Sequence, residues 1–166
     1  LRYLFPLLAF AFGVFFAERI QGRFKYAKRL HWRQGILGAE IIILFIVGFI
    51  PQRGNMIATV LVSFACAMQV QSFRKVNGFS YASTMCIGNL RSGTAALSFY
   101  LRERRPEQLR QAMYYLGIIV LFAIGAGIGG NLSANYGIHM IWVSCGLLIV
   151  SFLLMFLDIE ARRSRA

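Results

Sequence analysis

The chain has 166 residues, of which 58% are hydrophobic and only 14% are charged, so its apolar share exceeds that of an ordinary soluble domain. Eighteen Lys and Arg oppose six Asp and Glu, which gives a formal charge of +12. In a chain this apolar, such a charge indicates a membrane surface as its partner and not nucleic acid. The composition also excludes a disordered tail, and three scattered cysteines exclude a disulfide scaffold.

Six apolar segments approach the roughly 20 residues that a helix needs to cross about 30 Å of hydrocarbon. No period-2 alternation persists over more than a few residues, which favours a helical bundle over a membrane β-barrel. In chain order the segments cover residues 3–20, 35–50, 56–73, 79–101, 112–130 and 138–157. We therefore predict an all-α, polytopic membrane protein that forms a single transmembrane domain over residues 1–166.

The distribution of basic residues predicts the topology, because cytoplasmic loops collect Lys and Arg. Three stretches are rich in them: residues 19–33, residues 102–110 and the tail over residues 162–165. The first two stretches can face the same side only if an even number of the segments between them cross the membrane. Three apolar segments lie there, so one of them is expected not to cross.

The segment over residues 79–101 is the one that does not fit a crossing. It carries Arg91 near its middle, whereas the segment over residues 56–73 has no charge. If 79–101 dips into the bilayer and returns, fifteen of the eighteen basic residues lie in the cytoplasm, but a crossing removes this bias. We predict five crossings, one re-entrant or broken segment and a cytoplasmic C-terminus.

The same segment contains the predicted binding site, because broken backbone at membrane depth is tolerated only where it is buried in protein or lines a watery cavity. Polar groups and glycines concentrate there, at Thr84, Gly88, Asn89, Arg91 and Gly93. A half-helix that begins near Asn89 would favour an anion or a polar solute through its N–H groups and Arg91. In the alternative reading, Arg91 extends to the cytoplasmic surface and Asn89 only caps a helix.

Three further polar residues lie within apolar segments. Glu40 follows Gly35 by about 7.5 Å along the helix, and it either pairs with Arg91 or a loop arginine or couples transport to protons. Gln69 and Gln71 either line the site or form hydrogen bonds between helices. No paired carboxylates, His-rich spacing or activated nucleophile are found, so we expect no enzyme activity, no metal and no cofactor.

A glycine-rich run ends the segment over residues 112–130, where Gly125 and Gly129 form a small-xxx-small face. This face predicts close helix packing, either within the chain or with a second copy in a homo-oligomer. The expected partners are thus the lipid bilayer, a small polar or anionic solute and a second copy, with no nucleic acid, because the aromatic residues gather at segment ends.

The run over residues 67–78, followed by residues 84–92, carries a recognisable pattern. A Met-Gln helix end at Met68 and Gln69 and an Arg-Lys-x-x-Gly turn from Arg74 precede Ile87-Gly88-Asn89-Leu90. The pattern resembles the YoaK family of bacterial integral membrane proteins, known mainly as a domain of unknown function, whose core is Thr-Gly-Asn-Leu. The resemblance implies a bacterial cytoplasmic (inner) membrane and a missing N-terminal part with one more crossing and an earlier Thr-Gly-Asn copy.

With those parts the protein would consist of two inverted repeats that meet at two broken segments, as in many secondary transporters and some channels. This analogy predicts a small-solute transporter or channel with its polar site around Gly88, Asn89 and Arg91. The alternative is a membrane scaffold that transports nothing, in which the basic loop over residues 19–33 binds anionic lipid or a partner protein.

Overall fold

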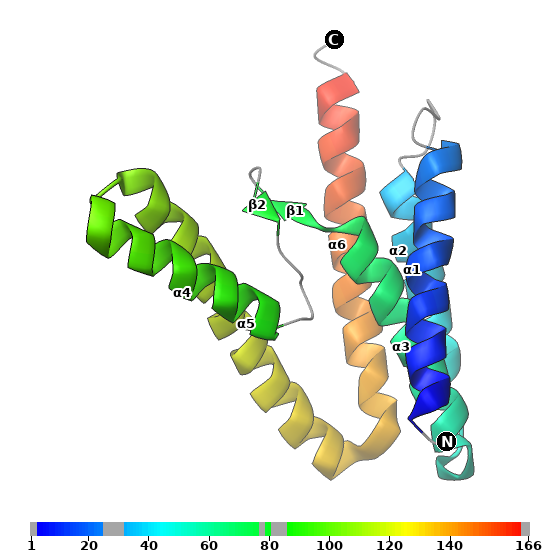
Figure 1. The fold of residues 1–166 in the computed structure, drawn as a ribbon. Coiled ribbons are helices and arrows are strands. Elements are labelled where there is room, and N and C mark those ends of the chain that lie inside the picture. The colour runs from blue at the N-terminus through cyan, green and yellow to red at the C-terminus, as the bar shows by residue number, and fades with distance from the viewer. Residues whose placement is uncertain (1–2, 25–31, 77–78, 81–85, 164–166) are drawn as a thin grey trace. The chain divides into compact units, whose positions relative to one another are not determined.

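The computed structural model describes residues 3–24, 32–76, 79–80 and 86–163. The elements in chain order are α1 (Leu4–Phe24), α2 (Trp32–Val47), the 3-10 helix η1 (Gln52–Gly54), α3 (Asn55–Ser72), β1 (Lys75–Val76), β2 (Phe79–Ser80), α4 (Cys86–Glu103), α5 (Pro106–Tyr136), the 3-10 helix η2 (Gly137–Met140) and α6 (Ile141–Arg163) (Figure 1).

The helices confirm the predicted all-α class, since β1 and β2 form only a two-residue antiparallel pairing with Lys75 opposite Ser80. Among the described residues, three stretches are helical, long and apolar enough to cross a membrane: Leu4–Arg23, Asn55–Ser72 and Pro106–Leu157, the last of which contains both α5 and α6. Helix α2 has 16 apolar-rich residues and is shorter, at about 24 Å. The chain is therefore an all-α, polytopic membrane protein.

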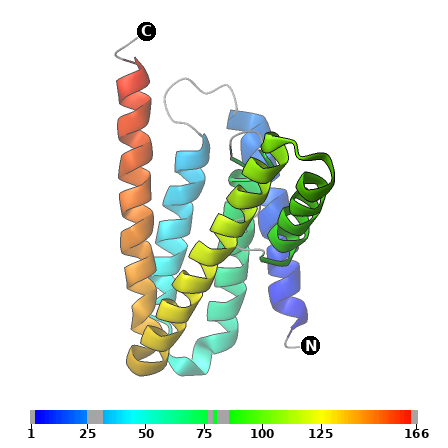
Figure 2. The same ribbon diagram turned by 90° about the vertical axis from the view of Figure 1, so that its left-hand side faces the viewer.

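The chain forms two compact units. The first comprises residues 1–72 and 133–166 and contains α1, α2, α3 and α6, whereas the second comprises residues 73–132 and contains β1, β2, α4 and most of α5. Within the first unit, α1, α3 and α6 run in one direction and α2 runs in the opposite one (Figures 1 and 2). Phe24, Ser72 and Arg163, the last residues of these three helices, therefore lie toward the same end of the bundle.

Helices α1 and α3 pack closely through small residues. A Cβ atom on Gly13 would lie 2.6 Å from the carbonyl oxygen of Phe64 and 2.8 Å from the Cβ of Ala67. Ala17, one turn further along α1, is fully buried beside Trp32, Ile36 and Met68. Gly13 and Ala17 thus form a small-xxx-small face that lets the two backbones approach each other.

Helices α2 and α6 meet through a second buried cluster, formed by Leu44, Ala65 and Cys145. At one end of this contact the indole N–H of Trp142 donates to the carbonyl oxygen of Phe45 at 3.4 Å. Gly48 supplies the space for that indole, because a Cβ there would overlap the Trp142 ring. These contacts fix α6 against α2.

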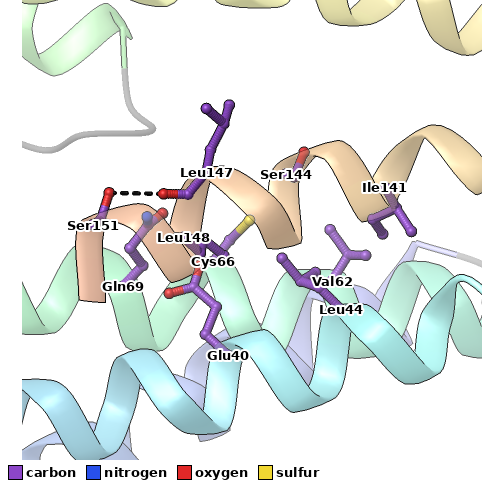
Figure 3. Close-up of a pocket in the computed structure, with 10 residues that line it drawn as sticks. All are labelled: Glu40, Leu44, Val62, Cys66, Gln69, Ile141, Ser144, Leu147, Leu148 and Ser151. Atoms are coloured by element: carbon purple, nitrogen blue, oxygen red, sulfur yellow. Dashed lines mark hydrogen bonds between the residues drawn. The ribbon is translucent and has the colours of Figure 1, made fainter. Parts of the chain in front are cut away.

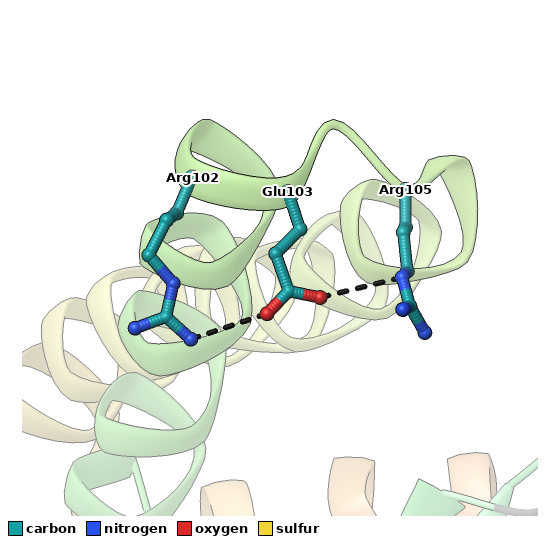
Figure 4. Close-up of polar contacts among 3 residues, drawn as sticks. All are labelled: Arg102, Glu103 and Arg105. Carbon is teal, nitrogen blue, oxygen red and sulfur yellow. Dashed lines mark hydrogen bonds and ion pairs between the residues drawn. The ribbon is translucent and has the colours of Figure 1, made fainter.

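The second unit is built on the packing of α4 against α5. Asn89, Gly93 and Ala96 are the buried residues of α4, and their spacing places them on one helix face. A Cβ on Gly93 would lie 3.0 Å from the Cβ of Tyr115 on α5. At the exposed turn between the helices, the Glu103 carboxylate lies 3.2 Å from a guanidinium nitrogen of Arg102 and 3.3 Å from one of Arg105 (Figure 4).

The segment over residues 79–101, which we expected to dip into the bilayer, contains β2 and most of α4. Residues 81–85 of this segment, which separate the two elements, lie outside the described part of the chain. The five segments expected to cross correspond to α1, α2, α3, α5 and α6, each with somewhat different ends.

Candidate functional site

The predicted site residues are distributed over both units. Gly88, Asn89 and Arg91 lie on α4, while Glu40 lies on α2 and Gln69 on α3. Thr84 lies outside the described residues. Of this set, the structure brings Glu40 and Gln69 together around one cavity of the first unit.

The polar residues of α4 do not converge on one point. The helix begins at Cys86, three residues before Asn89, and continues without interruption to Glu103. Asn89 is only 3% exposed and belongs to the helix face that contains Gly93, whereas Arg91 and Gly88 are exposed. Residues two positions apart in a helix point in directions that differ by about 200°, so Asn89 and Arg91 occupy different faces.

An open cavity of about 380 Å³, with exposed residues such as Leu147 at its edge, lies between α2, α3 and α6 (Figure 3). This volume lies within the range of roughly 300 to 1,000 Å³ that small-molecule sites occupy. All three helices belong to the first unit, and ten of their residues line the cavity: Glu40, Leu44, Val62, Cys66, Gln69, Ile141, Ser144, Leu147, Leu148 and Ser151.

The cavity has apolar walls with a few polar groups. The polar groups are the carboxyl of Glu40, the carboxamide of Gln69 and the hydroxyls of Ser144 and Ser151. The Ser151 hydroxyl donates to the carbonyl oxygen of Leu147 at 3.0 Å, so its own oxygen can still accept a hydrogen bond. A small number of polar groups in an apolar wall is typical of sites that orient a small ligand.

Glu40 is the most unusual of these residues. It lies midway along α2, is only 3% exposed, and its Oε2 atom has no hydrogen-bond partner in the described part of the chain. The pairing with Arg91 or a loop arginine that the sequence suggests stays a prediction. Burial of an ionised carboxylate without a partner is costly, so a protein keeps such a group only where another interaction compensates the cost.

The two glutamines of α3 face different neighbours. The Gln71 carboxamide donates to the Glu18 carboxylate of α1, whereas Gln69 lines the cavity on the other side of the helix. Their separation of two residues, about 200° around the helix, accounts for this difference. The sequence left a site role and a helix-to-helix role open for both, and the structure places each residue in one of these settings.

Sequence reasoning missed eight of the ten residues that line the cavity, among them the polar Cys66, Ser144 and Ser151. The signal that could have found the serines is their spacing, because residues seven apart in a helix lie on the same face. No set of three or more His, Cys, Asp or Glu side chains within the described part of the chain could hold a metal ion.

Comparison with known proteins gives one family and no closer relative. Residues 1–154 match the family described as "Protein of unknown function (DUF1275)". Neither a curated protein nor a solved structure matches the chain. The function is therefore inferred from the arrangement of the side chains.

Proposed function

The chain belongs to the DUF1275 family, whose function is unknown, and we propose that it is a small-solute transporter or channel. The observation that carries the proposal is the buried Glu40 carboxyl, which borders the cavity between α2, α3 and α6 and has an oxygen without a hydrogen-bond partner among the described residues. Ionisable residues inside membrane segments commonly mark substrate or ion pathways. The solute site that we propose is therefore the cavity around Glu40, in place of the region around Asn89 and Arg91.

A helix pair that serves packing alone gains nothing from a carboxyl at this position. An apolar residue would fill the space and avoid the desolvation cost of the carboxyl. The same unit shows how a glutamate is accommodated structurally, because Glu18 accepts a hydrogen bond from Gln71. Glu40 lacks such a bond to Oε2 in the described chain, which supports a role toward a ligand that enters the cavity.

The proposal includes a topology of five crossings in the bacterial inner membrane, with the C-terminus in the cytoplasm and a YoaK-type arrangement of inverted repeats. The common direction of α1, α3 and α6 supports it. Arg23 near the end of α1 and Arg163 at the end of α6 then lie toward the same end of the bundle, as a cytoplasmic location for both requires.

The direct test is solute flux through the purified protein in liposomes. Labelled erythritol, lactate and ethanolamine represent a neutral, an anionic and a cationic small solute. The proposal predicts uptake of at least one of them above the level of protein-free liposomes. Val62→Trp, which would fill the cavity from its apolar wall, should abolish that uptake.

The matched control is Ile57→Trp on the same helix, because Ile57 is 61% exposed and does not line the cavity. Its uptake should equal that of the wild type. Uptake that is absent for all three solutes, or that survives in folded Val62→Trp, would contradict the proposal.

The second candidate function is a scaffold that binds anionic lipid. Its support is a pair of cation–π contacts on α1 and α2, with the Arg19 guanidinium 5.0 Å from the Phe15 ring centre and the Arg33 guanidinium 5.4 Å from that of Trp32. Arginine and aromatic side chains are typical of membrane interfaces. A scaffold predicts no flux, together with thermal stabilisation by phosphatidylglycerol that is weaker in Arg19→Gln.

We also propose that Gly125 and Gly129 form the contact of a homo-oligomer. A Cβ on either residue would meet no atom of the described chain within 4 Å, so a second helix has space to approach closely. Gly125→Leu should then shift the protein to a smaller assembly in cross-linking experiments, whereas Gly22→Leu on α1 should not.

A further inference from the structure

The charge of the cavity is set by one residue. Glu40 is the only acidic residue among the ten described residues that line it, and they include no Lys, Arg or His. An ionised Glu40 would therefore repel an anion. A divalent cation would leave an excess positive charge, whereas a monovalent cation would balance the carboxylate.

The apolar walls of the cavity indicate that this cation is organic and has a hydrocarbon part. Alkyl side chains from three helices form most of the lining, including Leu44, Val62, Ile141 and Leu148. The cavity volume of about 380 Å³ is far larger than the roughly 30 Å³ that one water molecule occupies in the liquid. A bare ion would leave this apolar surface uncovered, but an alkyl group would cover it and gain the hydrophobic contribution.

The polar atoms of the cavity match an ammonium group. The Glu40 and Gln69 side chains extend from α2 and α3 toward α6 (Figure 3), and Ser144 and Ser151 of α6 also border the cavity. Carboxylate, carboxamide and hydroxyl oxygens all accept hydrogen bonds. The Glu40 carboxylate can therefore accept a hydrogen bond from an –NH₃⁺ group whose hydrocarbon part lies against the apolar walls.

We propose that the cavity between α2, α3 and α6 binds small organic monoammonium ions, with the ammonium group against Glu40 and the hydrocarbon part against the alkyl side chains. This inference names the solute class for the transport site proposed above and rests on that function for its biological meaning. The binding itself does not require transport.

The test is a binding titration with the full chain in detergent, using n-butylammonium chloride as the probe. Sodium butyrate and 1-butanol are matched probes with a negative and no charge. Isothermal titration calorimetry should show saturable binding of n-butylammonium, at least tenfold tighter than that of 1-butanol and with no binding of butyrate. Glu40→Gln, which keeps the shape and removes the charge, should weaken n-butylammonium binding at least tenfold.

The control variant is Glu103→Gln, which removes an exposed carboxylate outside the cavity and should leave the affinity unchanged. A second variant, Val62→Phe, reduces the cavity from its apolar wall and keeps Glu40. It should also weaken binding, and it tests the inference if Glu40→Gln fails to fold. Equal affinities for n-butylammonium and 1-butanol, or wild-type binding in folded Glu40→Gln or Val62→Phe, would overturn the proposal.

The outcomes separate this inference from the proposed function. Binding of n-butylammonium that depends on Glu40, without flux of any solute in liposomes, would leave the inference standing and remove the transport function. Flux of erythritol or lactate without n-butylammonium binding would leave transport standing and overturn the inference.

Discussion

The two sides of α3 accommodate a glutamate and a glutamine in different ways. Toward α1, Gln71 donates to Glu18, Gly13 leaves no space for a Cβ atom, and Ala17 is fully buried. Toward α2 and α6, Gln69 and Glu40 border a cavity, and Oε2 of Glu40 has no hydrogen-bond partner in the described chain. A glutamine and a glutamate thus stabilise the contact of α3 with α1. On the other side of α3 the same two types of side chain are available to a ligand.

The packing on the two sides agrees with this division. Small residues let the α1 and α3 backbones approach, and the rings of Phe12 and Phe64 stack beside them with centres 5.9 Å apart. The α2, α3 and α6 side combines a closed cluster around Leu44 with an open space next to it. A polar side chain on the first side should therefore contribute to stability, and one on the second side should contribute to binding.

The largest expected effect is on the closed side. Gly13→Ala places a methyl group against the backbone oxygen of Phe64, and we expect it to lower the free energy of unfolding by about 1–3 kcal/mol. Gly22→Ala on the same helix meets nothing within 4 Å and should be neutral or stabilising. Unfolding in increasing SDS, followed by circular dichroism, measures both. Equal midpoints for the two variants would show that α1 and α3 do not approach as closely as described.

A smaller effect distinguishes the two glutamines. Gln71→Leu removes the hydrogen bond to Glu18 and should cost about 1 kcal/mol. Gln69→Leu should cost much less, because its side chain borders a cavity and no partner helix depends on it. The same SDS titration compares the pair. If Gln69→Leu destabilised the protein more than Gln71→Leu, the assignment of the two sides would be reversed.

The smallest effect on stability is expected at Glu40. Glu40→Gln replaces a buried carboxyl group whose Oε2 lacks a hydrogen bond in the described chain, so the variant should be as stable as the wild type or slightly more stable. A loss of ligand binding without a loss of stability is the behaviour of a functional residue. A destabilisation larger than that of Gln71→Leu would instead indicate a structural role for Glu40.

The sequence predicts the all-α class correctly, because the length of its hydrophobic segments decides it. The sequence predicts the first and last residues of the helices less well. Helix α5 covers Pro106–Tyr136, whereas the apolar segment covers residues 112–130, since polar residues such as Gln108 and Asn135 continue a helix without adding hydrophobicity. Gly137, with a φ of +72°, marks the break before α6 because glycine adopts this conformation at little cost.

The site was predicted only in part. Glu40 and Gln69 attracted attention because polar side chains are rare in apolar segments, but their joint position depends on how α2, α3 and α6 pack. Ser144 and Ser151 look like ordinary helix residues in the sequence. The half-helix that the sequence predicts near Asn89 begins at Cys86, three residues earlier, and the solute site around Asn89 and Arg91 stays a prediction.

The most direct test of the account compares two native cysteines of the first unit. Cys66 lines the cavity, whereas Cys145 is only 3% exposed and packs with Leu44 and Ala65. Variants that retain one of the two and no other cysteine are treated in membranes with an impermeant, positively charged methanethiosulfonate reagent. The account predicts that Cys66 reacts at least tenfold faster than Cys145. Equally slow reactions, with both thiols reactive after SDS denaturation, would show that water does not reach the cavity and would contradict it.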